Sequence, residues 1–152
     1  MCRRVVAFAL VAVVAVPASA AAEVLQGTPR ADRLVDTARA DRIYGRGGDD
    51  DIRGRAGNDR LFGGRGDDLV AGDAGSDVIN GGSGDDTLLG GAGNDRITGG
   101  AGSDIIVAGA GNDVVRARDG EVDHIACGPG RDRVIADPQD VVARDCEIVR
   151  RG

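Results

Sequence analysis

A nine-residue repeat runs without a gap from Gly45 to Arg116, and it constrains the fold more than any other feature of the chain. Its rows, in order, are GRGGDDDIR, GRAGNDRLF, GGRGDDLVA, GDAGSDVIN, GGSGDDTLL, GGAGNDRIT, GGAGSDIIV and AGAGNDVVR. A unit this short can bury an apolar side chain only by stacking on its neighbours, as in a solenoid. The chain has 26 Gly but only one Tyr, two Phe and no Trp, which is too few aromatic residues for a conventional core.

The columns of the repeat predict its local structure. Position 4 is Gly in every row, position 6 is Asp and position 8 is Ile, Leu or Val. A position that accepts only Gly needs a positive φ or a close approach of two backbones. Position 5 is Asp, Asn or Ser, which suit turns. Each row is therefore predicted to form a six-residue turn and then a three-residue strand whose middle side chain points inward.

If two rows make one coil, residues 18 apart stack on each other and the position 8 residues form two facing aliphatic ladders. The first ladder is Ile52, Val70, Leu88 and Ile106, and the second is Leu61, Ile79, Ile97 and Val115.

The same stacking brings the position 6 carboxylates into two columns. Stacked turns lie roughly 5 Å apart, and like charges at that spacing repel by about 1 kcal/mol or more. The chain has no Lys, and its Arg residues occupy other positions of the repeat. A divalent cation between the turns would remove the repulsion, and oxygen ligands on a flexible frame favour Ca²⁺ over Mg²⁺ or Zn²⁺. The columns are Asp50, Asp68, Asp86 and Asp104, and Asp59, Asp77, Asp95 and Asp113.

These rows resemble the hemolysin-type calcium-binding repeats of RTX proteins, G-G-x-G-x-D-x-U-x. The resemblance covers residues 45–116 closely and implies an all-β fold, a right-handed parallel β-roll with capped ends. It implies Ca²⁺ held between turns two rows apart, which gives about six ions at the row pairs 45/63, 54/72, 63/81, 72/90, 81/99 and 90/108. The implied ligands are the eight Asp residues and the backbone carbonyls of positions 1 and 3. Those carbonyls belong to Gly45, Gly47, Gly54, Ala56, Gly63, Arg65, Gly72, Ala74, Gly81, Ser83, Gly90, Ala92, Gly99, Ala101, Ala108 and Ala110.

Both flanks of the repeat keep its rhythm in degenerate form. Residues 21–44 contain the rows GTPRADRLV and DTARADRIY, which lack the position 4 Gly. We interpret them as an N-terminal cap with poor or no metal binding; the alternative is an irregular linker. Residues 117–152 drift out of register by an insertion and are interpreted as a C-terminal cap, because terminal repeats must cover an open edge. Its predicted units are Asp123 with Ile125, Asp132 with Val134, and Asp140 with Val142.

Residues 1–20 have the pattern of a secretory signal peptide: Arg3 and Arg4, an apolar run over 5–16, and a small-residue site that ends at Ala20. Cleavage after Ala22 is the alternative site. An uncleaved anchor is the other alternative, although a spanning helix needs about 20 residues. We therefore expect a secreted, extracellular protein with no membrane span after cleavage. Loss of the two Arg residues takes the net charge from −6 to −8.

Cleavage also removes Cys2 and leaves Cys127 and Cys146, which we expect to form a disulfide in an oxidising compartment. Two free buried thiols and a metal-binding pair are the alternatives. This tail also resembles, more loosely, the Cys-containing ends of other secreted RTX-repeat proteins.

The sequence contains no recognisable catalytic motif. It has one His, His124, and no G-x-S-x-G turn, and its acidic balance argues against nucleic acid as a partner. We therefore expect a non-enzymatic, secreted calcium-binding protein that folds on binding Ca²⁺. One alternative is a cell-surface adhesive or structural module that binds a polymer or protein partner, of unknown identity, through the roll face; another is a small hydrolase. The predicted general secretory route departs from many RTX proteins, so a cytolytic activity is not carried over.

Overall fold

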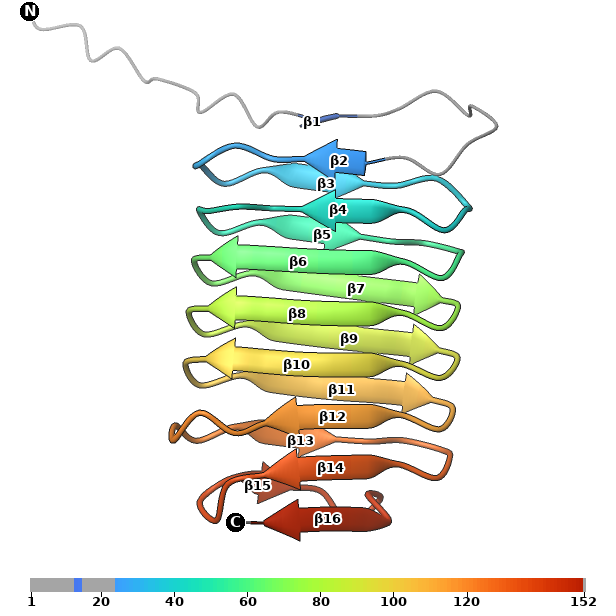
Figure 1. Ribbon diagram of the computed structural model, residues 1–152, viewed down its shortest axis with the longest axis vertical. Helices are drawn as coiled ribbons and strands as arrows, with labels where there is room; N and C mark the ends of the chain where they lie inside the picture. The colour runs from blue at the N-terminus through green and yellow to red at the C-terminus, as the bar shows by residue number, and fades with distance from the viewer. Residues whose placement is uncertain (1–12, 15–23, 152) are drawn as a thin grey trace, which may run out of the picture.

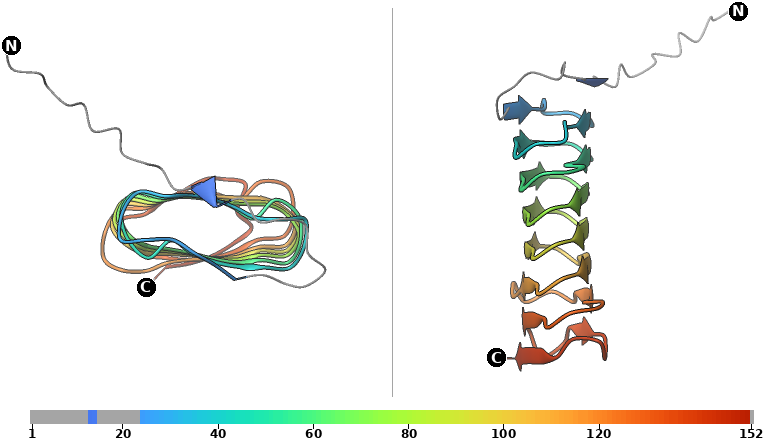
Figure 2. Two further views of the ribbon diagram at one scale, coloured as in Figure 1. Left: turned by 90° about the horizontal axis from the view of Figure 1, so that it is seen from above. Right: turned by 90° about the vertical axis from the view of Figure 1, so that its right-hand side faces the viewer.

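Short parallel strands stack into a tall column in the computed structural model, which describes residues 13–14 and 24–151 (Figure 1). Within these residues the regular structure is all β-strand. Seen from above, successive coils superpose into a flattened ring (Figure 2). Apart from Val13 and Val14, the predicted signal peptide lies outside the described residues. No helix in the described part of the chain is long and apolar enough to span a membrane.

Odd-numbered and even-numbered strands form two separate sheets, because the chain crosses from one sheet to the other with every row. The first sheet contains, in spatial order, β1 (Val13–Val14), β3 (Arg33–Val35), β5 (Asp51–Arg53), β7 (Leu69–Ala74), β9 (Thr87–Ala92), β11 (Ile105–Ala110), β13 (His124–Ala126) and β15 (Val141–Val142). The second contains β2 (Val24–Gln26), β4 (Arg42–Tyr44), β6 (Arg60–Arg65), β8 (Val78–Ser83), β10 (Arg96–Ala101), β12 (Val114–Ala117), β14 (Arg133–Ala136) and β16 (Ile148–Arg151). The protein is a parallel β-roll, as predicted.

The register within each sheet confirms the predicted stacking of residues 18 apart. In the first sheet Ile52 is paired with Val70, and Val70 with Leu88. In the second sheet Leu61 is paired with Ile79. All eight position 8 side chains are at most 1% exposed, so the two ladders form the thin aliphatic core between the sheets. One coil therefore consists of two rows.

Most strands of the repeat are longer than the three residues predicted, although β5, in the first row, has three and β12, in the last row, has four. Strands β6 to β11 each have six residues and continue through positions 1 to 3 of the following row. Gly64, for example, is paired with Gly82 and Arg65 with Ser83. Backbone pairing between adjacent coils thus overrides the low strand propensity of Gly, and the true turn is correspondingly shorter.

The position 4 glycines combine a positive φ with close contact to the preceding coil. Gly93 has φ +133°, and a Cβ added to it would lie 1.9 Å from the carbonyl oxygen of Gly75. No side chain fits there, so both reasons expected for an invariant Gly apply together. Gly120, in the downstream flank, has φ +94° but nothing within 4 Å of an added Cβ.

Substitutions at Gly93 and Gly120 can distinguish the effect of backbone strain from that of steric crowding. We expect Gly120→Ala to lower the free energy of unfolding by about 1 kcal/mol through backbone strain alone. Gly93→Ala should lower it by about 3 kcal/mol or more, because overpacking adds to the strain. Urea denaturation followed by circular dichroism at saturating Ca²⁺ measures both values. Equal losses for the two variants would contradict the close stacking of the turns.

The flanks continue the same roll at both ends. Upstream, Leu34 is paired with Ile52 and Ile43 with Leu61, so the degenerate rows are coils and not an irregular linker. Downstream, Ile125 is paired with Ile106, Val134 with Val115 and Val142 with Ile125, which confirms the three predicted units. Strand β16 adds one further unit that we did not anticipate, because Glu147 takes the place of its Asp.

A disulfide joins Cys127 and Cys146, whose Cα atoms are 5.2 Å apart, as predicted. It links the row that begins at residue 127 to the segment that precedes β16. In the loop-entropy account, a bridge closing a loop of this size stabilises the fold by roughly 3 kcal/mol.

Candidate metal centre

The eight predicted aspartates lie buried in the turns, in two columns along opposite edges of the roll. Each is at most 2% exposed. Carboxylates buried this deeply need a hydrogen-bond donor or a cation for each oxygen, because water no longer solvates them. The two oxygens of each carboxylate differ in this respect.

The Oδ1 atom of each Asp is a regular hydrogen-bond acceptor. Asp68 Oδ1 accepts the backbone N–H of Asp50 at 2.8 Å, and Asp86 Oδ1 accepts that of Asp68 at 2.8 Å. The same bond connects every successive pair in both columns. A ladder of carboxylate-to-amide bonds therefore ties each turn to the turn one coil later.

The Oδ2 atom of each of the eight is buried and has no hydrogen-bond partner among the described residues. Leaving a buried acceptor unsatisfied costs about 1–3 kcal/mol, and more when the group is charged. A repeated cost of this kind indicates that a partner outside the protein completes the site. Asp36, Asp123 and Asp132, which the sequence analysis did not include among the ligands, also have a buried Oδ2 without a hydrogen-bond partner.

The position 1 glycines make room for this second oxygen. A Cβ added to Gly63 would lie 2.3 Å from Asp68 Oδ2 and 2.6 Å from the carbonyl oxygen of Gly81, one coil later. The corresponding approach occurs at Gly45, Gly54, Gly72, Gly81 and Gly90. A carboxylate oxygen and a carbonyl oxygen from adjacent coils thus converge beside position 1. Such an all-oxygen environment fits Ca²⁺.

The predicted position 3 carbonyls also take part in the backbone ladder. The carbonyl of Arg65 accepts the N–H of Gly48 at 2.8 Å, and that of Ala74 accepts the N–H of Gly57 at 2.9 Å. A carbonyl oxygen has a second lone pair, so this bond leaves room for a metal ligand role. The complete carbonyl set remains a prediction.

No three His, Cys, Asp or Glu side chains gather into one cluster within the described residues. A cation in the turns would therefore depend on carboxylates of different rows together with backbone oxygens.

In the two upstream rows the position 6 carboxylates, Asp32 and Asp41, have protein donors for the second oxygen, although Asp36, at position 1, does not. Thr28 donates its backbone N–H to Asp32 Oδ2 at 2.5 Å, and the Thr37 hydroxyl donates to Asp41 Oδ2 at 2.8 Å. The Oδ2 atom of the position 6 Asp, which has no partner in the repeat, therefore has a protein donor in both upstream rows. This difference supports the prediction that these rows bind metal poorly or not at all.

Burial raises the pKa of the column carboxyls in the absence of metal. The pKa of Asp86 rises from 3.8 to about 7, mainly through desolvation and further through the charges of Asp104 and Asp68, against the lowering effect of its backbone hydrogen bond. The pKa of Asp50 and that of Asp95 rise to about 6, again chiefly through burial. Without a cation, the fold therefore favours protonated carboxyls.

A pH dependence with a definite sign follows for the metal-free protein. Because the folded pKa values lie above the unfolded value of 3.8, these carboxyls stabilise the fold fully below about pH 4. That contribution is lost as the pH rises through about 6 to 7. We expect urea denaturation in metal-stripped buffer to give a free energy of unfolding lower by more than about 2 kcal/mol at pH 8 than at pH 5. Stability that increases over this range would contradict the burial of these carboxyls in the metal-free fold.

The family of the protein follows from this repeat. The family model for the RTX calcium-binding nonapeptide repeat, in four copies, matches residues 26–61, 53–88 and 80–115. These segments span more than half of the chain, and the protein belongs to this family of calcium-binding repeats. The match begins upstream of Gly45 and so includes both degenerate rows. No curated protein matches the chain.

One substitution pair tests whether the unpartnered oxygen is a calcium ligand. Asp86→Asn keeps an Oδ1 acceptor but removes the buried charge, so we expect the metal-free protein to be no less stable than the parent. The stabilisation by Ca²⁺, about 2.7 kcal/mol per site at one hundred times the Kd, should shrink in this variant. Asp41→Asn is the control, since Thr37 already occupies Asp41 Oδ2. Denaturation with and without Ca²⁺ measures both effects, and equal losses of Ca²⁺ stabilisation would refute the assignment.

Proposed function

We propose that the protein is a secreted, non-enzymatic calcium-binding roll whose folding is coupled to Ca²⁺ binding. The observation that carries this proposal is the set of buried, unpartnered Oδ2 atoms in the two columns. Each unpartnered Oδ2 lowers the stability of the metal-free fold, and a cation bound to it would remove that penalty. The free energy of binding would then be, in large part, free energy of folding.

The number and kind of ions follow from the row pairs. We propose that the six pairs of loops within residues 45–116 each hold one Ca²⁺, with position 6 carboxylates and position 1 and 3 carbonyls as ligands. Ca²⁺ tolerates six to eight oxygen ligands in flexible geometry, whereas Mg²⁺ demands near-ideal octahedral geometry and retains water. Backbone carbonyls held by the strands and turns of the roll therefore suit Ca²⁺ better than Mg²⁺.

Two features support secretion. The N-terminal sequence has the pattern of a signal peptide. The disulfide between Cys127 and Cys146 is typical of oxidising compartments outside the cytosol. A protein exported in this way would meet Ca²⁺ after leaving the cell and fold there.

A non-enzymatic role is supported by where the acidic groups lie. The carboxylates with raised pKa values are distributed along the whole roll, with one in each row of the repeat, and their Oδ1 atoms are used by the backbone ladder. His124 lies exposed on the outer face of β13, between Ile105 and Val141 in the register. This arrangement supports a structural use of the acids.

Far-ultraviolet circular dichroism of residues 21–152 during a Ca²⁺ titration tests the proposal. We expect a cooperative change from coil to β-structure with Ca²⁺ and no such change with Mg²⁺ at equal concentration. A metal-free spectrum already rich in β-structure and indifferent to Ca²⁺ would mean that the aliphatic ladders and the disulfide suffice for folding. The proposed coupling would then be wrong.

A further inference from the structure

The row CGPGRDRVI, residues 127–135, lies beyond the end of the family match at residue 115 but stacks on the last repeat as a repeat row does. Gly109 donates its N–H to the carbonyl of Cys127 at 2.8 Å, and Gly111 donates to that of Pro129 at 2.9 Å. The second bond joins positions 4 and 3, like the bond from Gly93 to Ala110. An insertion in the preceding row disguises the register in the sequence, because partners here are 19 residues apart instead of 18.

The glycines of this row confirm the close stacking. A Cβ on Gly128 would lie 2.2 Å from the carbonyl oxygen of Gly109, and a Cβ on Gly109 would lie 2.0 Å from that of Gly91. The approach of coil to coil is therefore preserved past the end of the repeat.

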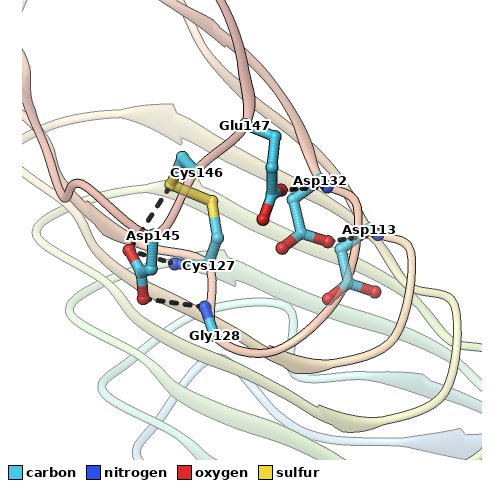
Figure 3. Close-up of a disulfide and its surroundings, with 7 residues drawn as sticks. All are labelled: Asp113, Cys127, Gly128, Asp132, Asp145, Cys146 and Glu147. Atoms are coloured by element: carbon cyan, nitrogen blue, oxygen red, sulfur yellow. Dashed lines mark hydrogen bonds between the residues drawn. A yellow bond between two sulfur atoms is a disulfide. The ribbon is translucent and has the colours of Figure 1, made fainter.

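Asp132 has the environment of a repeat aspartate. It is 0% exposed, its Oδ1 accepts the N–H of Asp113 at 2.8 Å, and its Oδ2 is buried without a partner. Figure 3 shows its carboxylate between that of Asp113 and that of Glu147 in a row of three acidic side chains. We propose that the loops 108–113 and 127–132 form a further calcium site, with Asp113 and Asp132 as its carboxylates. This inference rests on the proposed calcium-dependent function and adds one site to the six row pairs of the repeat.

The loop around Asp123 is different, although its Oδ2 is also unpartnered. The atoms nearest to an added Cβ at Gly99 are two atoms of Asp104 and then Ile106 Cδ1 at 3.4 Å. The carbonyl oxygen of the next coil, found within 3.0 Å at Gly54, Gly63 and the other repeat glycines, is missing from that point. The ten-residue row 117–126 thus lacks the convergence of oxygens, and we place no site there.

In the column that contains Asp113, the series of buried, unpartnered Oδ2 atoms ends at Asp132. Glu147 accepts the N–H of Asp132 at 2.7 Å, but Glu147 is exposed. In the other column, Asp140 Oδ2 accepts the N–H of Asp137 at 2.6 Å and so has a protein donor. Both terminal acids continue the amide ladder without offering a buried free oxygen.

Covalent and polar contacts hold the loop of the proposed site in place. Cys127 occupies position 1 of its row and forms the disulfide with Cys146. Asp145 Oδ2 accepts the N–H of Gly128 at 2.9 Å (Figure 3). The disulfide persists without metal and restricts this half of the site in the unfolded chain, which lowers the ordering cost of binding.

Arg131, in contrast, is expected to weaken cation binding at the proposed site. It takes position 5, where the repeat has Asp, Asn or Ser, and with Arg133 it lines a surface hollow of about 360 Å³ beside Asp113. A positive charge near the loop weakens cation binding. We therefore expect Arg131→Asn to tighten this one site about three- to sixfold.

Native mass spectrometry of residues 21–152, sprayed from increasing free Ca²⁺, tests the site. We expect Asp132→Asn to bind one ion fewer than the parent at saturation, while Glu147→Gln, which removes a neighbouring exposed charge, keeps the full number. An unchanged ion count in Asp132→Asn, with the parent loaded, would overturn this site and leave the proposed function intact. A parent that binds no ions would overturn both.

Arg131→Asn decides the question if Asp132→Asn does not fold. We expect one additional ion to be retained at a free Ca²⁺ concentration lower by the same three- to sixfold factor. Identical loading of Arg131→Asn and the parent at every concentration would show that no cation binds beside Arg131 and would overturn the proposal.

Discussion

The hydrogen bond from the backbone N–H of one aspartate to the Oδ1 of the aspartate one coil later governs the rest of the structure. It recurs at 2.8–2.9 Å from Asp32 to Asp132 in the two columns. Because it uses one carboxylate oxygen, it fixes where the other one points. The same contact that sets the spacing of the turns therefore creates the unpartnered Oδ2 atoms. Backbone architecture and metal chemistry are thus two consequences of one interaction.

The glycines of the repeat allow adjacent coils to stack closely in two ways. At position 4 they allow a positive φ and backbone contact between coils, as at Gly93. At position 1 the backbone is ordinary, and the missing side chain is what matters, because Asp Oδ2 occupies the space that a Cβ would fill. Crowding between adjacent coils, more than turn geometry alone, explains why the repeat contains so much Gly.

The nine-residue period predicted the coil length, both aliphatic ladders and the aspartate columns, since stacking leaves few other arrangements for so short a unit. It did not predict the strand length or the positive φ at position 2, where Arg46, Arg55 and Asp73 also adopt it. Strand length and the φ of position 2 depend on pairing with a neighbouring coil, and the sequence of a single row does not reveal that pairing. Asp132 was recognised as a strand unit but not as a ligand, because the insertion near Gly120 interrupts the periodicity. The roles of Thr28 and Thr37 require the geometry of donors and acceptors in three dimensions.

The ladder of amide-to-carboxylate bonds always points the same way along the roll. Each aspartate donates toward the C-terminal end and accepts from the N-terminal end. The two ends of the rod are therefore chemically unequal. At the N-terminal end, Thr28 and Thr37 donate to the other oxygen, Oδ2, of Asp32 and Asp41. At the C-terminal end the last amides must find acceptors, which Asp140 and Glu147 provide. A group that covered the N-terminal end of the ladder would therefore have to supply hydrogen-bond donors, whereas a group that covered the C-terminal end would have to supply acceptors.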